Sequence, residues 1–550
     1  MPIYGIDLGT SNCLVAEAIE TLSGDFEIRC LRDEKGNESF PSVVSFKSKN
    51  EVVVGEKALF ELYKNPDQTV ELIKTRLGKK KYLDIEIDGE KEQIETQKIS
   101  GIVLNHFNKI HKNKIKKAVL TVPAIFDEQQ KKATAQSGQV ADIELVRTIP
   151  EPCAAVMYHV FRQYKDNKTN LLDYKTGKNV LVFDFGGGTL DLALASIKLD
   201  DDDNVEITVL AIGGDEELGG NLIDFKLTEV VLDYYCDEFE YDKFIEEVKE
   251  EYDYYYSNYR ANGELRFRDN AREEVKSFIF RLKNKCERAK IELSTKNITT
   301  LTPEGIYSQL DIDREDFKEL VLEDGDLLPR IKESIRIIQG KNKKNVPIDQ
   351  VILVGGSAQI PYIKKYLQQE FPHFRNKIIN AIDYDNAIAK GAAILAAIED
   401  GHNVPPFGRN NVKNVVAHDL YVNQDGINES DEPFLSYGTS YPFSERQTKD
   451  LPIRKSLDTK INIKFVEKFI RQGTEKEKII QDINFYHPFF YTNDHIRVEI
   501  DIDELGMYKF TATHVETGES IEFEAEQLFE MSNTEIEKAK REIKILRDIS

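Results

Sequence analysis

The 550-residue sequence has few cysteines and no long apolar segment. Both shortages limit the classes of protein to which it can belong. The longest apolar runs, near residues 118–126 and 391–398, are well short of the roughly 20 residues that a membrane-spanning helix needs. Few cysteines without close pairing are typical of a reducing cytosol. They are Cys13, Cys30, Cys153, Cys236 and Cys286. The sequence therefore predicts a cytoplasmic protein with no membrane segment.

Basic residues are scarce relative to acidic ones. There are 74 Lys and Arg against 97 Asp and Glu, a formal net charge of -23. Because this charge would repel a phosphate backbone, nucleic acid is not expected as a partner. The nine histidines show no metal-ligand spacing, which argues against a zinc site. No basic segment followed by an apolar run opens the chain, so no signal peptide is expected.

Three Gly-rich turns lie far apart in a chain long enough for several domains. In residues 5–11 (GIDLGTS) and 182–191 (VFDFGGGTLD), an apolar strand delivers an Asp into a Gly/Thr turn and a second apolar strand follows. Glycine lets the backbone approach an anion, Thr or Ser adds a hydroxyl, and the Asp can hold a hydrated divalent cation. Residues 351–357 (VILVGGS) add a Gly-Gly-Ser turn. Together the three turns predict a nucleotide site.

Seven short motifs occur in the order seen in the DnaK-type, 70-kDa heat-shock chaperones. They are residues 7–12, 121–124 (TVPA), 150–152 (PEP), 184–191, 218–220 (LGG), 287–294 (ERAKIELS) and 354–357. The sequence resembles this family from Ile3 to about Ile398 and, more weakly, beyond. The resemblance implies an α/β fold: an actin-like two-lobed ATPase domain, followed by an antiparallel β-sandwich and one short C-terminal helix.

The resemblance also assigns roles to individual residues. It implies ATP or ADP with Mg²⁺, held through water by Asp7, Asp184 and Asp191, and leaves K⁺ open as a further ion. Lys74 would offset charge on the γ-phosphoryl group, and Glu151 would orient the attacking water or accept its proton, so that the catalytic set is Lys74, Glu151, Asp184 and Asp7. The residues expected to contact the nucleotide are Gly9, Thr10, Ser11, Asn12, Gly186, Gly187, Gly188, Thr189, Glu287, Lys290, Ser294, Gly355, Gly356, Ser357 and Asp385.

Some of these residues also have simpler interpretations. The 287–292 segment is what an ordinary exposed helix with charges at helical spacing would look like. Lys74 is otherwise one surface lysine among many. Cys153 is interpreted as a small packed residue and not as a nucleophile, because no His or Asn partner can be named for it. The acidic run 200–203 is interpreted as a solvated loop tip and not as a calcium loop.

The composition changes after about residue 400, where Gly, Pro and Asn are frequent. We expect an ATPase domain over 1–402, an interdomain linker over 403–420, a substrate-binding-like β-sandwich over 421–530 and a short helix, a truncated lid, over 531–550. Residues 412–420 resemble the apolar linker of the family, although a short edge strand would give the same pattern. Ala417 and His418 stand there where larger aliphatic residues are expected.

The expected sandwich is based on alternation of polar and apolar residues. This period of two predicts an antiparallel meander with one buried face, in residues 460–465, 496–503, 508–512 and 521–525. A capping-box signature at 532–535 then opens a helix, and apolar residues follow at helical spacing: Ile536, Ala539, Ile543 and Leu546. We expect this helix to brace the sandwich. Without a longer helical lid, the sequence resembles the short, lid-poor (HscC-like) branch of the family.

The implied partners are unfolded or extended polypeptide, with a J-domain cochaperone and a nucleotide exchange factor left open. Lys131 stands where the family has a relay Arg; it keeps the charge but loses the planar bidentate fork. Pro150 replaces an Asn next to Glu151, at a surface that the family uses with J-domain cochaperones, although Arg147 is retained. Gln359 stands where many relatives have an adenine-stacking Arg. The segment 241–272 is longer than expected. It places four tyrosines on one helix face, which is either local core or a partner surface: Tyr252, Tyr255, Tyr256 and Tyr259.

Two classes of function follow. The favoured one is an ATP-dependent molecular chaperone of the heat shock 70-kDa type, an ATP hydrolase whose Mg-ATP hydrolysis is coupled to binding and release of polypeptide, as in a stress response. The alternative is an actin-fold ATPase that acts as a switchable scaffold for one dedicated partner, or a small-molecule kinase.

Overall fold

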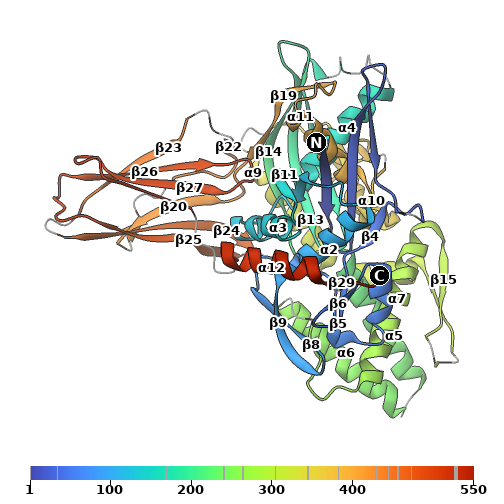
Figure 1. The fold of residues 1–550 in the computed structure, drawn as a ribbon. Helices are drawn as coiled ribbons and strands as arrows, with labels where there is room; N and C mark the ends of the chain where they lie inside the picture. The colour runs from blue at the N-terminus through green and yellow to red at the C-terminus, as the bar shows by residue number, and fades with distance from the viewer. Residues whose placement is uncertain are drawn as a thin grey trace.

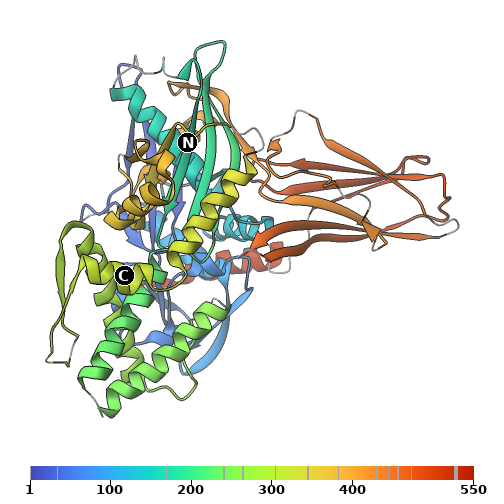
Figure 2. The same ribbon diagram turned by 180° about the vertical axis from the view of Figure 1, so that it is seen from behind.

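In the computed structural model, a two-lobed α/β body carries a β-sandwich that projects from its side (Figure 1), and the view from behind shows the same division (Figure 2). The structure describes residues 2–550 except 34, 167–170, 172–173, 240–241, 263–264, 304, 307, 343–345, 382, 426, 429–431, 442, 444, 455–457, 472–473 and 525–529. This arrangement is the two-lobed α/β domain and sandwich that the sequence predicts.

The sheet of the first lobe is built around a hairpin. Strand β1 (Ile3–Leu8) pairs antiparallel with β2 (Asn12–Glu20) and parallel with β10 (Lys117–Val122). Strand β3 (Phe26–Cys30) lies beyond β2, and β11 (Glu144–Pro150) lies beyond β10. The strand order is therefore β11-β10-β1-β2-β3.

The sheet of the second lobe repeats this plan. Strand β12 (Lys178–Phe185) pairs antiparallel with β13 (Leu190–Leu199) and parallel with β17 (Gln350–Val354). Strand β14 (Val205–Asp215) lies beyond β13, and β18 (Ile378–Asn380) lies beyond β17. Because the two sheets share one plan, the turns β1–β2 and β12–β13 occupy corresponding positions in the two lobes. An internal duplication of this kind defines an actin-like architecture.

Helices and small sheets surround the two central sheets. Those of the first lobe are β4 (Ser39–Pro41), β5 (Val44–Ser48), β6 (Glu51–Val54), α1 (Glu56–Glu61), β7 (Thr69–Val70), β8 (Tyr82–Ile87), β9 (Glu90–Glu95), α2 (Thr96–Ile110), α3 (Glu128–Val140) and α4 (Glu151–Asp166). Those of the second are α5 (Gly220–Glu238), α6 (Lys243–Asn262), α7 (Glu273–Thr295), β15 (Ile298–Leu301), β16 (Leu310–Asp313), α8 (Arg314–Phe317), α9 (Leu327–Lys341) and α10 (Pro361–Glu370). Helix α11 (Ala387–Glu399) follows them in the chain but packs on β1, β2 and β10 of the first lobe.

Helix α11 packs tightly against both β1 and α4. A Cβ atom on Gly5 would lie 2.2 Å from the backbone N of Ala393, and one on Gly391 would lie 1.8 Å from the carbonyl O of Ala154. Neither approach leaves room for a side chain, so glycine is required at both positions. These contacts hold α11 between the first lobe's sheet and α4, and α4 in turn packs against β12 and β13 of the second lobe.

The tyrosine-rich helix α6 belongs to the core of the second lobe. Tyr252 and Tyr255 are no more than 1% exposed, and Tyr256 and Tyr259 are less than 10% exposed. Three of these rings pack around Phe225 of α5. The ring centroid of Phe225 lies 5.9 Å from that of Tyr255, 5.4 Å from that of Tyr256 and 4.7 Å from that of Tyr259. Of the two interpretations, local core is therefore confirmed over a partner surface. The acidic run 200–203 is a turn between β13 and β14, as expected.

The sandwich consists of two four-stranded antiparallel sheets, as the alternation predicts. Its strands are β20 (Asp419–Gln424), β21 (Ile427–Asn428), β23 (Gln447–Pro452), β24 (Lys460–Arg471), β25 (Thr474–Tyr486), β26 (His495–Ile502), β27 (Tyr508–His514) and β28 (Ser520–Glu524). The orders are β21-β20-β24-β25 and β23-β26-β27-β28. Phe465 and Phe510, with ring centroids 4.2 Å apart, join the two sheets at the core.

The segment between the domains extends the second lobe's sheet. Strand β19 (Phe407–Val415) pairs parallel with β14 and antiparallel with β22 (Ser440–Tyr441). Val415 packs in the core of the two-lobed domain, whereas Val416 and Leu420 pack in the sandwich core. The segment is thus a strand of the second lobe's sheet, next to the edge strand β22, and it connects to the sandwich, so that its apolar residues divide between the two domains.

The C-terminal helix does not brace the sandwich, contrary to the sequence expectation. Helix α12 (Asn533–Ile545) begins with the predicted capping box. Its apolar face, with Ile536, Ala539 and Ile543, packs in the core of the first lobe, against α2 and α3. Strand β29 (Arg547–Asp548) then pairs parallel with β6. In Figure 1, α12 (red) lies beside α3 on the two-lobed body, near the root of the sandwich and away from its tip.

We expect Ile543→Ala to loosen this helix from the ATPase domain. Ile543 is 2% exposed, and an apolar residue of this size that is truncated in a core costs about 2–5 kcal/mol. Hydrogen exchange of the α12 amides should therefore accelerate by at least about 30-fold. Ile545→Ala is the matched control, because Ile545 lies on the same helix and is 75% exposed. Equal protection in the two variants would contradict the observed packing.

Candidate nucleotide site

The two Asp-bearing turns face each other across the gap between the lobes. A Cβ atom on Gly187 would lie 2.4 Å from Ser11 Oγ, and one on Gly188 would lie 2.6 Å from Thr10 Cγ2. A Cβ on Gly9 would collide with the carbonyl O of Asn12 at 2.0 Å. The close contact between the turns thus depends on glycine. The residues of the two turns are far apart in the sequence but meet in the fold. They include the residues that the sequence predicts around the phosphates: Gly9, Thr10, Ser11, Asn12, Gly186, Gly187, Gly188 and Thr189.

Four carboxylates and one lysine are buried beside these turns. Asp7, at the end of β1, accepts a hydrogen bond from Thr121 Oγ1 at 3.0 Å. Lys74 donates a hydrogen bond to Glu151 Oε1, and both side chains are less than 10% exposed. Lys74 lies in the 3₁₀ turn Ile73–Arg76, and Glu151 is the first residue of α4. Lys74 is therefore not a surface lysine.

Burial and mutual repulsion perturb the acidic groups. Burial, followed by the charge of Glu151, raises the pKa values of Asp7, Asp184 and Asp191. Asp191 is held by the backbone N–H of Ala124 at 2.8 Å and by the Thr189 hydroxyl at 2.7 Å. Burial lowers the pKa of Lys74, but the Glu151 and Asp7 carboxylates outweigh this effect and raise it above the usual value. Four acidic groups against one ammonium leave an excess of buried negative charge.

The third turn completes the second lobe's side of the site. Gly355 has φ of 84°, and a Cβ there would lie 2.5 Å from the carbonyl O of Phe185. The Ser357 hydroxyl donates to the carbonyl O of Gly186 at 2.8 Å. A Cβ on Gly356 would lie 3.7 Å from Asp385 Oδ1, which places Asp385 beside the turn. Burial raises the pKa of Asp385.

Helix α7 contributes a buried ion pair that the sequence did not reveal. Lys290 Nζ lies 2.7 Å from Asp224 Oδ1 on α5 and donates to the carbonyl O of Gly220 at 3.1 Å. Burial raises the pKa of Asp224 to about 6 against the opposing effect of Lys290, and the charge of Glu287 raises it further. Ser294 Oγ donates to the carbonyl O of Lys290 at 3.3 Å. The helix is thus tied to the phosphate-turn side of the lobe and is not merely an exposed surface helix.

The residues present fit a nucleotide with a divalent cation. Asn221 Nδ2 is buried near Gly187, and it has no hydrogen-bond partner among the residues that the structure describes. Such a donor beside a Gly-rich turn suits a phosphate oxygen. The excess of carboxylates suits a hydrated hard cation. Cys153, by contrast, is 1% exposed and packs in the core, as expected.

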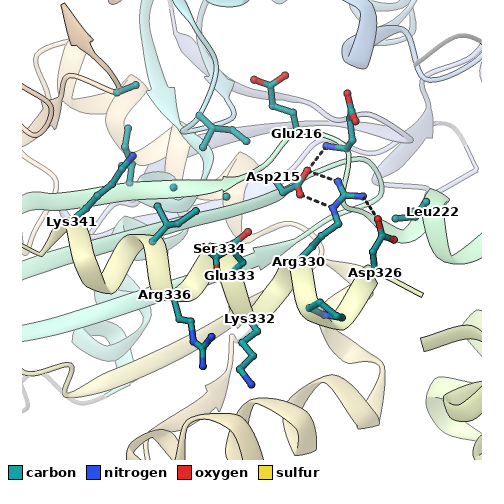
Figure 3. Close-up of a pocket in the computed structure, with 18 of the residues that line it drawn as sticks. Asp215, Glu216, Leu222, Asp326, Arg330, Lys332, Glu333, Ser334, Arg336 and Lys341 are labelled. Atoms are coloured by element: carbon teal, nitrogen blue, oxygen red, sulfur yellow. Dashed lines mark hydrogen bonds and ion pairs between the residues drawn. The ribbon is translucent and has the colours of Figure 1, made fainter. Parts of the chain in front are cut away.

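Apart from the candidate nucleotide site, a cavity of about 840 Å³ lies where the two-lobed domain meets the sandwich. Helix α9 and the end of β14 line it, and Asp215 forms a bidentate ion pair with Arg330 at 2.7 and 2.8 Å (Figure 3). Ala417 and His418 of the interdomain segment close it. Next to it, the Tyr437 hydroxyl of the sandwich domain donates to the carbonyl O of Ile212 at 2.7 Å. This junction is one of the places where the two domains contact each other; Lys478 of the sandwich also pairs with Asp127 of α3's N-terminal cap.

The fold and the facing phosphate-type turns define a two-lobed, actin-like nucleotide-binding domain joined to a β-sandwich. The family model described as "Hsp70 protein" matches residues 3–255 and 250–547. The protein belongs to the Hsp70 family.

Curated relatives agree with this assignment. The chain is 31% identical over 413 residues to a protein named "Chaperone protein DnaK" from Thermosipho melanesiensis, covering 72% of this chain and 59% of that protein. It is 30% identical over 470 residues to a protein of the same name from Thermotoga neapolitana, covering 82% of this chain and 67% of that protein. The chain thus spans about three fifths to two thirds of the length of these relatives. In the part of the chain that the structure describes, no helix could cross a membrane.

Proposed function

We propose that the protein is an ATP-dependent molecular chaperone that couples Mg-ATP hydrolysis to the binding and release of unfolded or extended polypeptide. The observation that carries this proposal is the pairing of the buried Lys74–Glu151 couple with two Asp-bearing Gly turns, in a domain that is physically joined to a sandwich. Family membership supports it over a kinase or a dedicated scaffold.

The buried residues would divide the chemistry of hydrolysis between them. Mg²⁺ bound with ATP would supply charge neutralisation at the phosphates, and Asp7, Asp184 and Asp191 would hold its water ligands. Glu151 would orient the attacking water and accept its proton. Lys74, which holds Glu151 in place, would offset negative charge on the transferring group. Gly9 to Asn12 and Gly186 to Thr189 would cradle the phosphates.

The remaining predicted residues would hold the rest of the nucleotide. Those expected near the ribose and adenine are Glu287, Lys290, Ser294, Gly355, Gly356, Ser357 and Asp385. The Lys290–Asp224 pair would position α7. K⁺, a J-domain cochaperone and a nucleotide exchange factor belong to the proposal as further ligands and partners. Arg147, on the surface expected for a J-domain protein, forms an ion pair with Glu399 at 2.6 Å, so a cochaperone there would have to exchange this contact.

Peptide release tests the proposal directly. A fluorescent Leu-rich extended peptide should bind the full chain, and ATP should change its dissociation rate because the docked and undocked states bind it differently. Anisotropy with ADP and then with ATP measures this change, and Lys74→Ala, which should still bind ATP, separates binding from hydrolysis. Failure to bind any peptide while ATP is hydrolysed would favour the dedicated scaffold. Turnover equal to buffer alone would remove the ATPase itself.

A further inference from the structure

Three side chains that could bind a metal ion converge at the outer end of the sandwich. Asp494 precedes β26, His514 is the last residue of β27, and Glu516 lies in the following turn. Their ligand atoms all lie within 4.8 Å of one another. The opposite end of the same hairpin contacts the ATPase domain, where the carbonyl O of Leu505 accepts a hydrogen bond from Thr148. The cluster is therefore separate from the nucleotide site.

The distances suit a coordination site. His514 Nε2 lies 3.2 Å from Asp494 Oδ2 and 3.5 Å from Glu516 Oε2. Nitrogen and oxygen ligands bind zinc at about 2.0–2.2 Å, so neighbouring ligands of a tetrahedral ion lie about 3.3–3.5 Å apart. A charge-assisted hydrogen bond between imidazole and carboxylate is shorter, about 2.7–2.9 Å. The spacings of 3.2 and 3.5 Å are close to the edges of such a tetrahedron, and the shorter one also lies at the long end of an ordinary hydrogen bond.

Hydrogen bonding alone does not give every carboxylate of this cluster a donor from His514. A neutral imidazole carries one N–H, so His514 Nε2 can satisfy one of the two carboxylates that face it, not both. A cation between the three groups would engage all of them and relieve the repulsion between the acids. His495 Nδ1 lies 3.5 Å from the other oxygen of Glu516, which adds a second imidazole at the edge of the cluster.

Each of the three groups is also oriented by a further contact. His514 Nδ1 lies 2.8 Å from Thr517 Oγ1, which fixes the ring and leaves Nε2 for a ligand. Asp494 Oδ2 and Glu516 Oε2 each accept a backbone N–H, at 3.0 and 3.1 Å. Outer contacts of this kind hold metal ligands in place. The His514 side chain is 2% exposed and that of Glu516 is 37% exposed, so solvent can reach the outer side of the cluster.

The spacing of the histidines in the sequence argues against a zinc site, but the fold brings one histidine together with two carboxylates. We propose that Asp494, His514 and Glu516 form a site for a divalent metal ion of the Zn²⁺ type, with water as the fourth ligand. The imidazole favours such an ion over Mg²⁺ or Ca²⁺, which prefer all-oxygen sites. The ion would tie the loop before β26 to the turn after β27. That loop exposes Phe489 and Tyr491, at 54% and 55%, so the ion would also fix an aromatic surface at the tip of the sandwich.

Calorimetric titration of the full chain with ZnCl₂, without nucleotide, tests this site. We expect one zinc ion to bind, and Glu516→Gln and Asp494→Asn, which keep the side-chain shapes, each to weaken binding at least about tenfold. His402→Asn is the matched control, because His402 lies 3.6 Å from Glu20 and 3.9 Å from Asp400 but is 44% exposed. Its affinity should equal that of the unmodified chain.

A second readout separates the site from adventitious binding. Zinc should slow hydrogen exchange in residues 487–494 of the unmodified chain and of His402→Asn, but not of Glu516→Gln. Millimolar Mg²⁺ should not displace it. The proposal is overturned if no zinc binds at micromolar concentration, if both carboxylate variants bind zinc as well as the unmodified chain does, or if Mg²⁺ competes.

Discussion

Replacing Glu151 with Gln or Ala, or Asp184 with Asn, is expected to lower kcat for ATP hydrolysis by about 10²-fold or more. The reason is that Glu151, which pairs with Lys74 beside the phosphate turns, is the proton acceptor in the proposed mechanism, and Asp184 is one of the acids that would hold the cation. Single-turnover hydrolysis measures the chemical step directly. Nucleotide affinity, measured separately, should change much less for Glu151→Gln than kcat does.

The two Glu151 variants distinguish chemistry from packing. Glu151→Ala leaves the Lys74 ammonium buried without its partner, which destabilises the site, whereas Glu151→Gln keeps a hydrogen-bond acceptor there. A loss of turnover in Glu151→Ala alone would therefore indicate structural damage. Asp385→Asn is a suitable comparison, because Asp385 lies beside the Gly356 turn and not in the acidic cluster, and its effect should be on affinity. Full turnover in Glu151→Gln would contradict the proposed role of Glu151 as proton acceptor.

The phosphate turns can be predicted from the sequence because their requirements are local. A strand, an Asp, glycines and a hydroxyl within ten residues are sufficient to specify each turn. Lys74 and Glu151 can be predicted only through resemblance, since nothing in the local sequence marks either one as buried. Their meeting depends on the 3₁₀ turn that delivers Lys74 to the start of α4, and that contact spans 77 positions.

The sequence does not predict which surface covers an amphipathic element. The spacing of Ile536, Ala539 and Ile543 establishes an apolar face but not its partner, and that partner is the first lobe. Similarly, Val415 and Val416 form one apolar pair in the sequence, yet successive residues of an extended chain point in opposite directions and here enter different domains. Asp224 lacks a local signal altogether, because its role arises from a lysine on another helix.

We expect His418 to make the contact between the domains sensitive to pH. In the docked arrangement it is enclosed by the domain junction and lines the cavity there, and burial, followed by the charges of Lys341 and Lys131, lowers its pKa to about 3. An exposed histidine titrates near pH 6.5. Because the docked pKa is lower, docking is fully stabilised above about pH 6.5 and weakens as pH falls below it. Burial also lowers the pKa of Lys341, to about 8, which is above this window.

Two carboxyl groups at the same junction act in the opposite direction. Burial raises the pKa of Glu467 to about 7, with a further contribution from Asp127, and it raises that of Glu128 well above its usual value. If separation of the domains exposes them, these groups favour docking at low pH and lose that effect as pH rises toward neutrality. The unmodified chain thus combines opposing dependences, and only a comparison with a His418 variant isolates the histidine.

We expect the docking constant of the unmodified chain, divided by that of His418→Leu, to fall about tenfold between pH 7.5 and pH 5.5. Hydrogen exchange of the β19 amides with ATP present, corrected for the intrinsic pH dependence of exchange, measures docking, because β19 pairs with β14 in the docked arrangement and we expect this pairing to be lost when the domains separate. Glu467→Gln should show the opposite change, since it removes a group that favours docking in acid. His402→Leu, at an exposed histidine just before the linker, should leave the ratio unchanged. A ratio for His418→Leu that does not vary with pH would show that this histidine keeps its charge state when the domains separate.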